Sequence, residues 1–166
     1  VHLLTEVMRR TFADRAQHLG DPDFNSNMPI EKLTSKEFAK NRFRQIDMNS
    51  ASKSDSSTFG QTYDGNNTTH FSVVDKDGNA VSLTYTLEDS YGSKMGSNKL
   101  GFIFNNEMGD FNPVPGVTNS QGQIGSAANI IAPEKRMLSS MTPTIVAKDG
   151  KPFLIIGSPG GRTIIN

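Results

Sequence analysis

The sequence predicts an α+β fold in which the helices come first and the antiparallel strands follow. In the first third of the chain, apolar residues recur at steps of three and four, which is the period of a helix. From Thr69 onward they alternate with polar residues, which is the period of a strand. Because the period changes only once along 166 residues, a layered antiparallel sheet is favoured over an alternating parallel α/β fold.

The first predicted helix covers residues 3–19 and carries one apolar stripe. Gly20 follows it, where a C-terminal cap is expected. The sequence Asp21-Pro22-Asp23 then predicts a turn, because a proline keeps the residue before it out of the helical conformation. The stripe consists of Leu3, Leu4, Val7, Met8, Phe12, Ala16 and Leu19.

A second helix is predicted to start at Thr34, whose hydroxyl can cap it. Glu37, three residues later, completes a capping box. After this helix, residues 48–67 contain five serines, few apolar residues and no periodicity. This stretch is predicted to be a flexible linker of about 20 residues, a length at which loops are usually functional or disordered. The predicted buried face of the second helix consists of Phe38, Ala39, Phe43 and Ile46.

The first hairpin is predicted to begin at Thr69 with a strand whose Phe71 and Val73 alternate with polar neighbours. Asp77-Gly78-Asn79 is a typical hairpin turn, and residues 81–86 form the returning strand.

Two more strand segments are predicted further along the chain. Residues 101–105 are expected to form a short apolar strand. Residues 143–147 and 153–156 are expected to pair as a second hairpin around the turn Lys148-Asp149-Gly150-Lys151.

Charge and composition exclude several classes of function. Lys and Arg number 17, and so do Asp and Glu, so no basic excess points to nucleic-acid binding. The longest apolar run is residues 153–156, far short of the ~20 apolar residues that a membrane-spanning helix needs. Cysteine is absent, which excludes disulfides and thiolate chemistry. His2, His18 and His70 are scattered and do not have the spacing of metal ligands.

The junction between the linker and the first strand is the strongest chemical signal. The polar linker runs into Asn67-Thr68-Thr69-His70 and then into a strand that we expect to be buried. If the bond before a threonine were cut, the freed α-amine could act as base for its hydroxyl. The residues alone leave a plainer interpretation open, in which the two threonines simply begin a strand. Likewise, Ser139-Ser140 alone could be a serine turn.

Residues 68–81 closely resemble the start of the small subunit of γ-glutamyltranspeptidases. The resemblance continues in order through five further motifs, and two upstream motifs resemble the end of the large subunit. It covers nearly the whole chain except the linker. The further motifs are residues 84–87, 104–108, 110–111, 135–145 and 157–161, and the upstream ones are residues 13–15 and 20–24.

The resemblance implies a fold and a division of the chain. The family folds as an N-terminal-nucleophile hydrolase, a four-layer αββα sandwich, and is made as one precursor that cuts itself before a threonine. The cut would fall between Asn67 and Thr68. Residues 1–47 would then be the helical C-terminal end of the large subunit, 48–67 the linker ending at the cleavage site, and 68–166 the N-terminal part of the small catalytic subunit.

The resemblance also assigns catalytic roles. Thr68 would be the nucleophile of both self-cleavage and γ-glutamyl transfer. Thr86 matches the family's second threonine, whose hydroxyl forms a hydrogen bond with the nucleophile. Gly160 and Gly161 match the glycines of the oxyanion hole, and glycines suit this role because they let main-chain N–H groups approach a developing negative charge closely.

Five further residues match positions that hold the substrate in the family. The γ-glutamyl group carries an α-ammonium and an α-carboxylate. Glu107 and Asp110 match the acids that bind the ammonium, and Glu88 matches a position that is Asn in many members and Glu in some. Ser139 and Ser140 match the serine pair that donates hydrogen bonds to the carboxylate. From the residues alone, the two acids could equally lie in a solvated loop.

The resemblance implies a γ-glutamyl acyltransferase and hydrolase. Such an enzyme cleaves glutathione and related γ-glutamyl compounds through a γ-glutamyl-Thr ester, and passes the group to water, amino acids or peptides. It needs no cofactor. Its partners are the two subunits of its own precursor, and it is periplasmic or secreted. The alternatives are a related acylase of the same superfamily or a catalytically silent, uncleaved fragment. Because the chain starts at Val1 and stops at Asn166 without a terminator, we expect an excised piece that is inactive alone.

Overall fold

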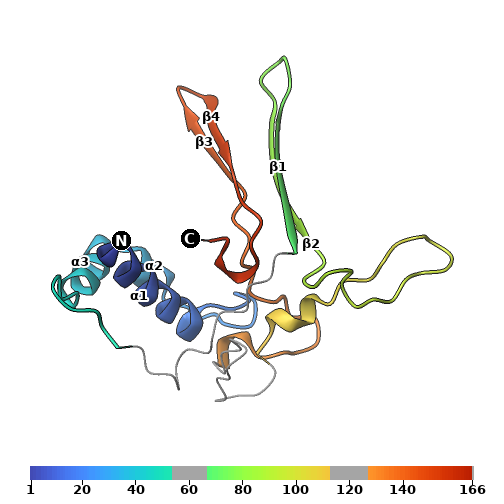
Figure 1. Cartoon of the computed structure of the whole chain (residues 1–166). Coiled ribbons are helices and arrows are strands. Elements are labelled where there is room, and N and C mark those ends of the chain that lie inside the picture. Colours follow the sequence, from blue (N-terminus) through green and yellow to red (C-terminus); the bar gives the residue numbers. More distant parts are fainter. Residues whose placement is uncertain (54–66, 113–126, 166) are drawn as a thin grey trace. The chain divides into compact units, whose positions relative to one another are not determined.

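The computed structural model describes residues 1–53, 67–112 and 127–165 (Figure 1). Residues 54–66, which make up most of the predicted linker, lie outside the described residues. Within the described ranges the helices α1, α2 and α3 precede four antiparallel strands, which confirms the α+β prediction. None of the described helices is long and apolar enough to cross a membrane.

The chain divides into two compact units, each built from segments that are distant in sequence. The first unit contains the three helices and a later segment in whose described residues no strand is found, and the second contains both hairpins. The first unit comprises Val1–Thr62 and Asp110–Leu138, and the second Tyr63–Gly109 and Ser139–Asn166.

Helix α1 spans His2–His18, within one residue of the prediction at either end. Leu19 is already extended, and its N–H closes the last turn on the carbonyl of Arg15 at 2.9 Å. Gly20 stands next, but close packing explains it better than a cap does. A methyl group on Gly20 would overlap the carbonyl of Ala128, so only glycine allows the two backbones to approach this closely.

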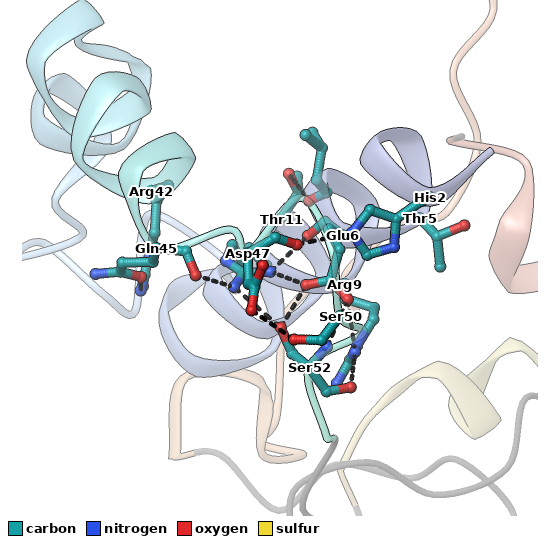
Figure 2. Close-up of polar contacts among 12 residues, drawn as sticks. His2, Thr5, Glu6, Arg9, Thr11, Arg42, Gln45, Asp47, Ser50 and Ser52 are labelled. Carbon is teal, nitrogen blue, oxygen red and sulfur yellow. Dashed lines mark hydrogen bonds and ion pairs between the residues drawn. The ribbon is translucent and has the colours of Figure 1, made fainter.

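The buried residues of α1 are two acids, Glu6 and Asp14, and a single member of its apolar stripe, Ala16. Glu6 is only 1% exposed, whereas Leu3, Leu4 and Val7 are exposed. Burial of a carboxylate requires bonding partners, and Glu6 has them: Arg9 contacts it at 3.0 Å, and the hydroxyl of Ser52 donates to it at 2.5 Å. Figure 2 shows this cluster, which ties the first residues of the predicted linker to α1.

The predicted second helix is α3, which spans Lys36–Arg44, and a short helix that was not predicted, α2 over Ile30–Thr34, precedes it. The predicted cap is wrong by one residue. Thr34 closes α2 by donating to the Ile30 carbonyl at 2.8 Å, and Ser35 caps α3 by accepting from the N–H of Phe38 at 3.1 Å. The expected buried face is also wrong, since Ala39 and Phe43 are exposed and Phe38 and Ile46 only half-buried.

Asn129 organises the later segment of the first unit. It ends the short 3₁₀ helix η2, Ala127–Asn129, and is almost fully buried. Its Nδ2 donates to the carbonyl of Asp110 at 2.7 Å, and its Oδ1 accepts from the N–H of Leu138 at 3.1 Å. One buried amide thereby joins both ends of this segment, with donor and acceptor satisfied.

The second unit holds two antiparallel hairpins (Figure 1). Strands β1, Thr68–Val74, and β2, Ala80–Thr86, form the first, and β3, Thr144–Lys148, and β4, Lys151–Ile156, form the second. Both hairpins agree with the predicted ones to within two residues. The turn between β1 and β2 uses Gly78 at φ 84°, a conformation that favours glycine.

The two faces of the first hairpin differ sharply. One face is entirely polar at its base and middle, and the other is apolar and exposed, with Tyr85 61% exposed. The expectation of a buried strand is therefore wrong for the described residues. The polar face carries Thr68, His70 and Ser72 on β1 opposite Thr86, Thr84 and Ser82 on β2, and the apolar face carries Phe71, Val73, Val81, Leu83 and Tyr85.

Residues 101–105 do not form the predicted strand. Ile103 makes only an isolated bridge with Gly96, and the main chain of Phe104 bonds to Ser93 and Met95 at 2.9 Å each. The segment folds back on its own loop, and it follows Gly101 at φ 70°, a value at which an extended strand cannot continue.

Candidate active site

Thr68 opens β1 and lies directly opposite Thr86, the last residue of β2. Opposed residues of an antiparallel pair point to the same face of the sheet, so the two predicted threonines are neighbours. Both are half-buried. The Oγ1 of Thr86 accepts the N–H of Glu88 at 3.0 Å, which orients the side chain. A hydroxyl that accepts in this way still has its own proton to donate.

Asn67, the residue before the predicted cleavage point, is tied to the loop after β2. Its Oδ1 accepts the hydroxyl of Ser90 at 2.6 Å. Ser90 was not among the predicted site residues, because no spacing in the sequence links it to Asn67, 23 positions away. The bond holds one side of the predicted scissile peptide in place.

Gly160 and Gly161 lie between β4 and the 3₁₀ helix η3, Gly161–Thr163. Their φ values are 139° and 60°, a region that side chains disfavour, so glycine is needed at both positions. The first N–H groups of a helical turn have no acceptor within that turn, which is compatible with the predicted oxyanion-hole role of these glycines.

The polar face of the first hairpin holds the end of β4. Ser82 donates to the carbonyl of Ile156 at 3.1 Å, and Ser72 to that of Ile155 at 3.5 Å. The ring of His70 lies against Gly157, where an added methyl group would overlap it. The face that carries Thr68 therefore also positions the chain that leads into Gly160.

His70 is bonded at both ring nitrogens. Its Nδ1 lies 2.8 Å from Oγ1 of Thr84 and its Nε2 lies 3.2 Å from Oγ of Ser72. Two hydroxyl partners can satisfy either neutral tautomer of the ring. His70 thus fills a structural position on the face that carries Thr68.

Glu88 and Glu107 lie close together in the second unit, with one carboxylate oxygen of each within 4.8 Å of the other. Like charges at this separation favour a cation between them. Arg162 lies 3.9 Å from Glu88 and donates to the carbonyl of Gly109 at 2.9 Å. Arg162 was not among the predicted site residues, although its position directly after Gly160-Gly161 could have indicated that it lies near the site. Two carboxylates supply fewer oxygens than Ca²⁺ requires.

Glu88 has a φ of 73°, and a non-glycine residue in this region carries backbone strain. Strain of this kind persists where the surrounding structure imposes it, and it often occurs at functional sites. Glu107 and Asp110 are the first and last residues of one 3₁₀ helix, η1. Asp110 begins the later segment of the first unit, where its carbonyl accepts from Asn129.

The serine pair precedes β3. The Oγ of Ser139 accepts the N–H of Met141 at 3.1 Å, which is the serine turn that the residues alone allowed. Ser140 is buried. The turn fixes the orientation of both residues, which is compatible with a role in binding.

The solved structures that are similar to this chain are gamma-glutamyltranspeptidases, which have the N-terminal-nucleophile hydrolase fold. An acivicin-inhibited gamma-glutamyltranspeptidase is similar to this chain with a TM-score of 0.53 and 56% identity, over 58% of this chain and 52% of that one. The model of the family described as Gamma-glutamyltranspeptidase matches residues 1–166. The chain therefore belongs to the gamma-glutamyltranspeptidase family, as its motifs indicated.

Two curated relatives show how much of a family member the chain represents. It is 48% identical over 167 residues to a glutathione hydrolase proenzyme of Escherichia coli, with 99% of this chain and 29% of the relative covered. It is 40% identical over 153 residues to the putative inactive glutathione hydrolase 4 of Arabidopsis thaliana, with 89% of this chain and 79% of the relative covered. The chain thus spans less than a third of the length of the Escherichia coli relative.

Proposed function

We propose that this chain is the central part of a γ-glutamyl acyltransferase and hydrolase that acts on glutathione and related γ-glutamyl compounds. The name of the Escherichia coli relative supports both glutathione as substrate and synthesis as a proenzyme. The observation that carries the proposal is the placement of Thr68 at the start of β1, directly opposite Thr86.

In the proposed maturation, the Oγ of Thr68 attacks the carbonyl carbon of Asn67. The peptide C–N bond breaks, the nitrogen becomes the α-amine of Thr68, and water releases the Asn67 carboxylate from the transient ester. The hydrogen bond between Asn67 and Ser90 supports this step because it restrains the carbonyl side of the scissile bond. A self-cleaving chain needs such restraint, since a misplacement of about 1 Å can cost ~100-fold in rate.

The same hydroxyl then performs the transfer. With its α-amine as base, Thr68 Oγ attacks the γ-carbonyl carbon of the substrate, and the amide C–N bond breaks as the amine leaves with a proton. The γ-glutamyl ester on Thr68 is next attacked by water or by an acceptor amine. Thr86 donates a hydrogen bond to the nucleophile, and the N–H groups of Gly160 and Gly161 stabilise the negative oxygen.

The acids and serines of the site suit the head group of the substrate. Glu88, Glu107 and Asp110 are proposed to bind the α-ammonium, and Ser139 and Ser140 the α-carboxylate. Hydrogen bonds to ionised groups are roughly twice as strong as those between neutral groups. The close approach of Glu88 and Glu107 supports this role, because two carboxylates favour a cationic ligand.

The chain is proposed to be processed and exported. Residues 1–47 would end the large subunit, 48–67 would form the linker, and 68–166 would begin the small subunit. The partners of each piece are then the other subunit and small γ-glutamyl substrates. We place the enzyme in the periplasm or outside the cell, in line with the resemblance.

The test is Thr68→Ala in a precursor of full family length. We expect one uncut band on a denaturing gel and no release of chromophore from a γ-glutamyl anilide. Thr68→Ser, which keeps a hydroxyl, should retain part of both activities, and Thr69→Ala is the control for the neighbouring residue. A Thr68→Ala precursor that still divides into two bands would refute the assignment of Thr68.

A second candidate is a catalytically silent protein. It is favoured by one observation: the chain covers most of a relative whose name describes it as putatively inactive. The anilide assay on the unsubstituted precursor separates the two, because a silent protein folds and shows no turnover.

A further inference from the structure

One contact in the first unit joins the turn after α1 to a segment more than a hundred residues later. The carboxylate of Asp21, with its side chain only 1% exposed, accepts bonds on both oxygens. The main-chain N–H and Nε of Arg136 donate to Oδ2 at 2.7 and 3.1 Å, and Nη2 donates to Oδ1 at 2.6 Å. Arg136 is 115 positions away from Asp21 in the sequence.

Further hydrogen bonds surround this ion pair, in which the Asp21 side chain is buried and the Arg136 side chain is 64% exposed. Oδ1 of Asp21 also accepts the N–H of Asp23 at 3.1 Å, and Nη2 of Arg136 also reaches Asp23 at 2.5 Å. The bonds from Arg136 hold the pKa of the Asp21 carboxyl well below its ordinary value, and the acids raise that of Arg136. Planar, two-pronged pairing of this kind is specific to arginine.

The backbones beside the ion pair also meet closely. Nδ2 of Asn25 donates to the carbonyl of Ala128 at 2.8 Å, while the same amide group holds the carbonyl of Asp21 at 2.9 Å. Gly20 lies against that same Ala128 carbonyl. Residues 20–25 and residues 128–136 therefore form one continuous contact, which we call the Asp21–Arg136 junction.

The two sides of this junction lie on opposite sides of the proposed cleavage point. We propose that the Asp21–Arg136 junction is an intersubunit lock, in which residues 20–25 of the upstream product bind residues 128–136 of the downstream product after the bond before Thr68 is cut. The proposal rests on the proposed cleavage. Before the cut, the junction is an internal contact of the precursor, and after it the same bonds hold two separate polypeptides.

The lock is tested in a precursor of full family length with an affinity tag on its upstream end. After self-cleavage the upstream product is immobilised and washed with increasing urea, and the retained downstream product is measured. Arg136→Gln removes the guanidinium and should weaken the association by about tenfold or more, since hydrogen bonds to charged groups are among the stronger ones. Arg136→Lys keeps the positive charge but lacks the planar guanidinium that donates to both carboxylate oxygens, so we expect an intermediate loss of association.

Lys151→Gln is the matched control, because it removes an exposed cation from β4 of the same downstream product. Asp21→Asn provides a second variant from the other side of the contact. Release of the Arg136→Gln and Asp21→Asn products at the same urea concentration as the control would overturn the lock.

Failure of the proposed cleavage has a different signature, namely a parent precursor that runs as one uncut band. In that case a protease site inserted immediately before Thr68 supplies the cut, and the same urea comparison still decides whether the junction holds the products together.

Discussion

His70 and Gly157 illustrate how a single missing methyl group can position a site. The imidazole bonds to hydroxyls of both strands of the first hairpin and rests on the backbone of Gly157 at the end of β4. A side chain at position 157 would push β4 away from the face that carries Thr68. The distance between that threonine and the Gly160 turn thus depends on a glycine that touches neither of them.

We therefore expect Gly157→Ala to reduce kcat/KM of the full-length enzyme strongly, because a displacement of about 1 Å can cost ~100-fold. Gly96→Ala is the control, since a methyl group there meets only an ordinary contact with the Phe102 carbonyl. Steady-state kinetics with a γ-glutamyl anilide measures the effect. If the steric contact with His70 is the cause, the double variant His70→Ala/Gly157→Ala should have nearly the same kcat/KM as His70→Ala alone. If instead the kcat/KM losses of the two single variants multiply in the double variant, the steric explanation is wrong.

Single residues also show why the site was only partly visible in the sequence. Thr68, Gly160 and Gly161 stand in recognisable motifs, whereas Ser90 and Arg162 reach their partners through loops. Their spacing from those partners has no period, so only folding brings them together. The structure places the predicted threonines opposite each other, while the assigned roles of the site residues stay predictions until variants are assayed.

Among the elements, α1 combines a predictable position with an unpredictable buried face. Periodicity placed the helix within one residue, because steps of three and four recur over its whole length. The same periodicity suggested an apolar interface, yet the most buried residue of α1 is Glu6. Long-range partners such as Ser52 decide which side of α1 is buried, and no local pattern in the sequence indicates them. For a similar reason the observed N-cap of α3 is Ser35 and not the predicted Thr34. Both hydroxyls could cap a helix, and the backbone geometry selects Ser35.

The hydrogen bonds to the Glu6 carboxylate predict a pH dependence for the first unit. Hydrogen bonds from Ser52 and Arg10 lower the pKa of Glu6 from 4.5 to about 2. A carboxyl whose pKa is lower in the folded state stabilises the fold at pH values above 4.5, and this stabilisation is lost as the pH falls toward 2. Figure 2 shows Ser52 bonded to the Glu6 carboxylate.

We expect Glu6→Gln to be less stable than the parent at neutral pH but to lose less stability between pH 4.5 and pH 2. Urea unfolding followed by far-UV circular dichroism at several pH values measures this. Glu31→Gln, which changes an exposed acid of α2, is the control and should keep the parent's pH dependence. Parallel stability curves for the parent and Glu6→Gln would mean that the Glu6 cluster is not the source of the acid sensitivity.

At the scale of the whole molecule, the described hairpins are not self-sufficient. Each sheet has two strands, and an isolated two-stranded hairpin is marginally stable in water. Apolar side chains such as Tyr85 and Phe153 are more than half exposed. Hydrophobic faces of this extent usually mark surfaces that another part of a protein covers. The chain also spans only 29% of the Escherichia coli relative, so that relative has ample sequence for such a cover.

This architecture leads us to expect that the polypeptide of residues 1–166 does not cut itself. Self-cleavage needs Thr68 held against the Asn67 carbonyl with the Gly160 turn in place, and a marginal hairpin does not maintain that geometry. Without the cut, Thr68 also has no free α-amine to act as base. Intact-mass spectrometry of the purified polypeptide should therefore show one species with the mass of the whole chain, and a γ-glutamyl anilide should not be hydrolysed. A precursor of full family length, treated identically, is the control and should give two masses that divide before Thr68. Two such masses from the 166-residue polypeptide would instead show that the first hairpin reaches a cleavage-competent geometry unaided.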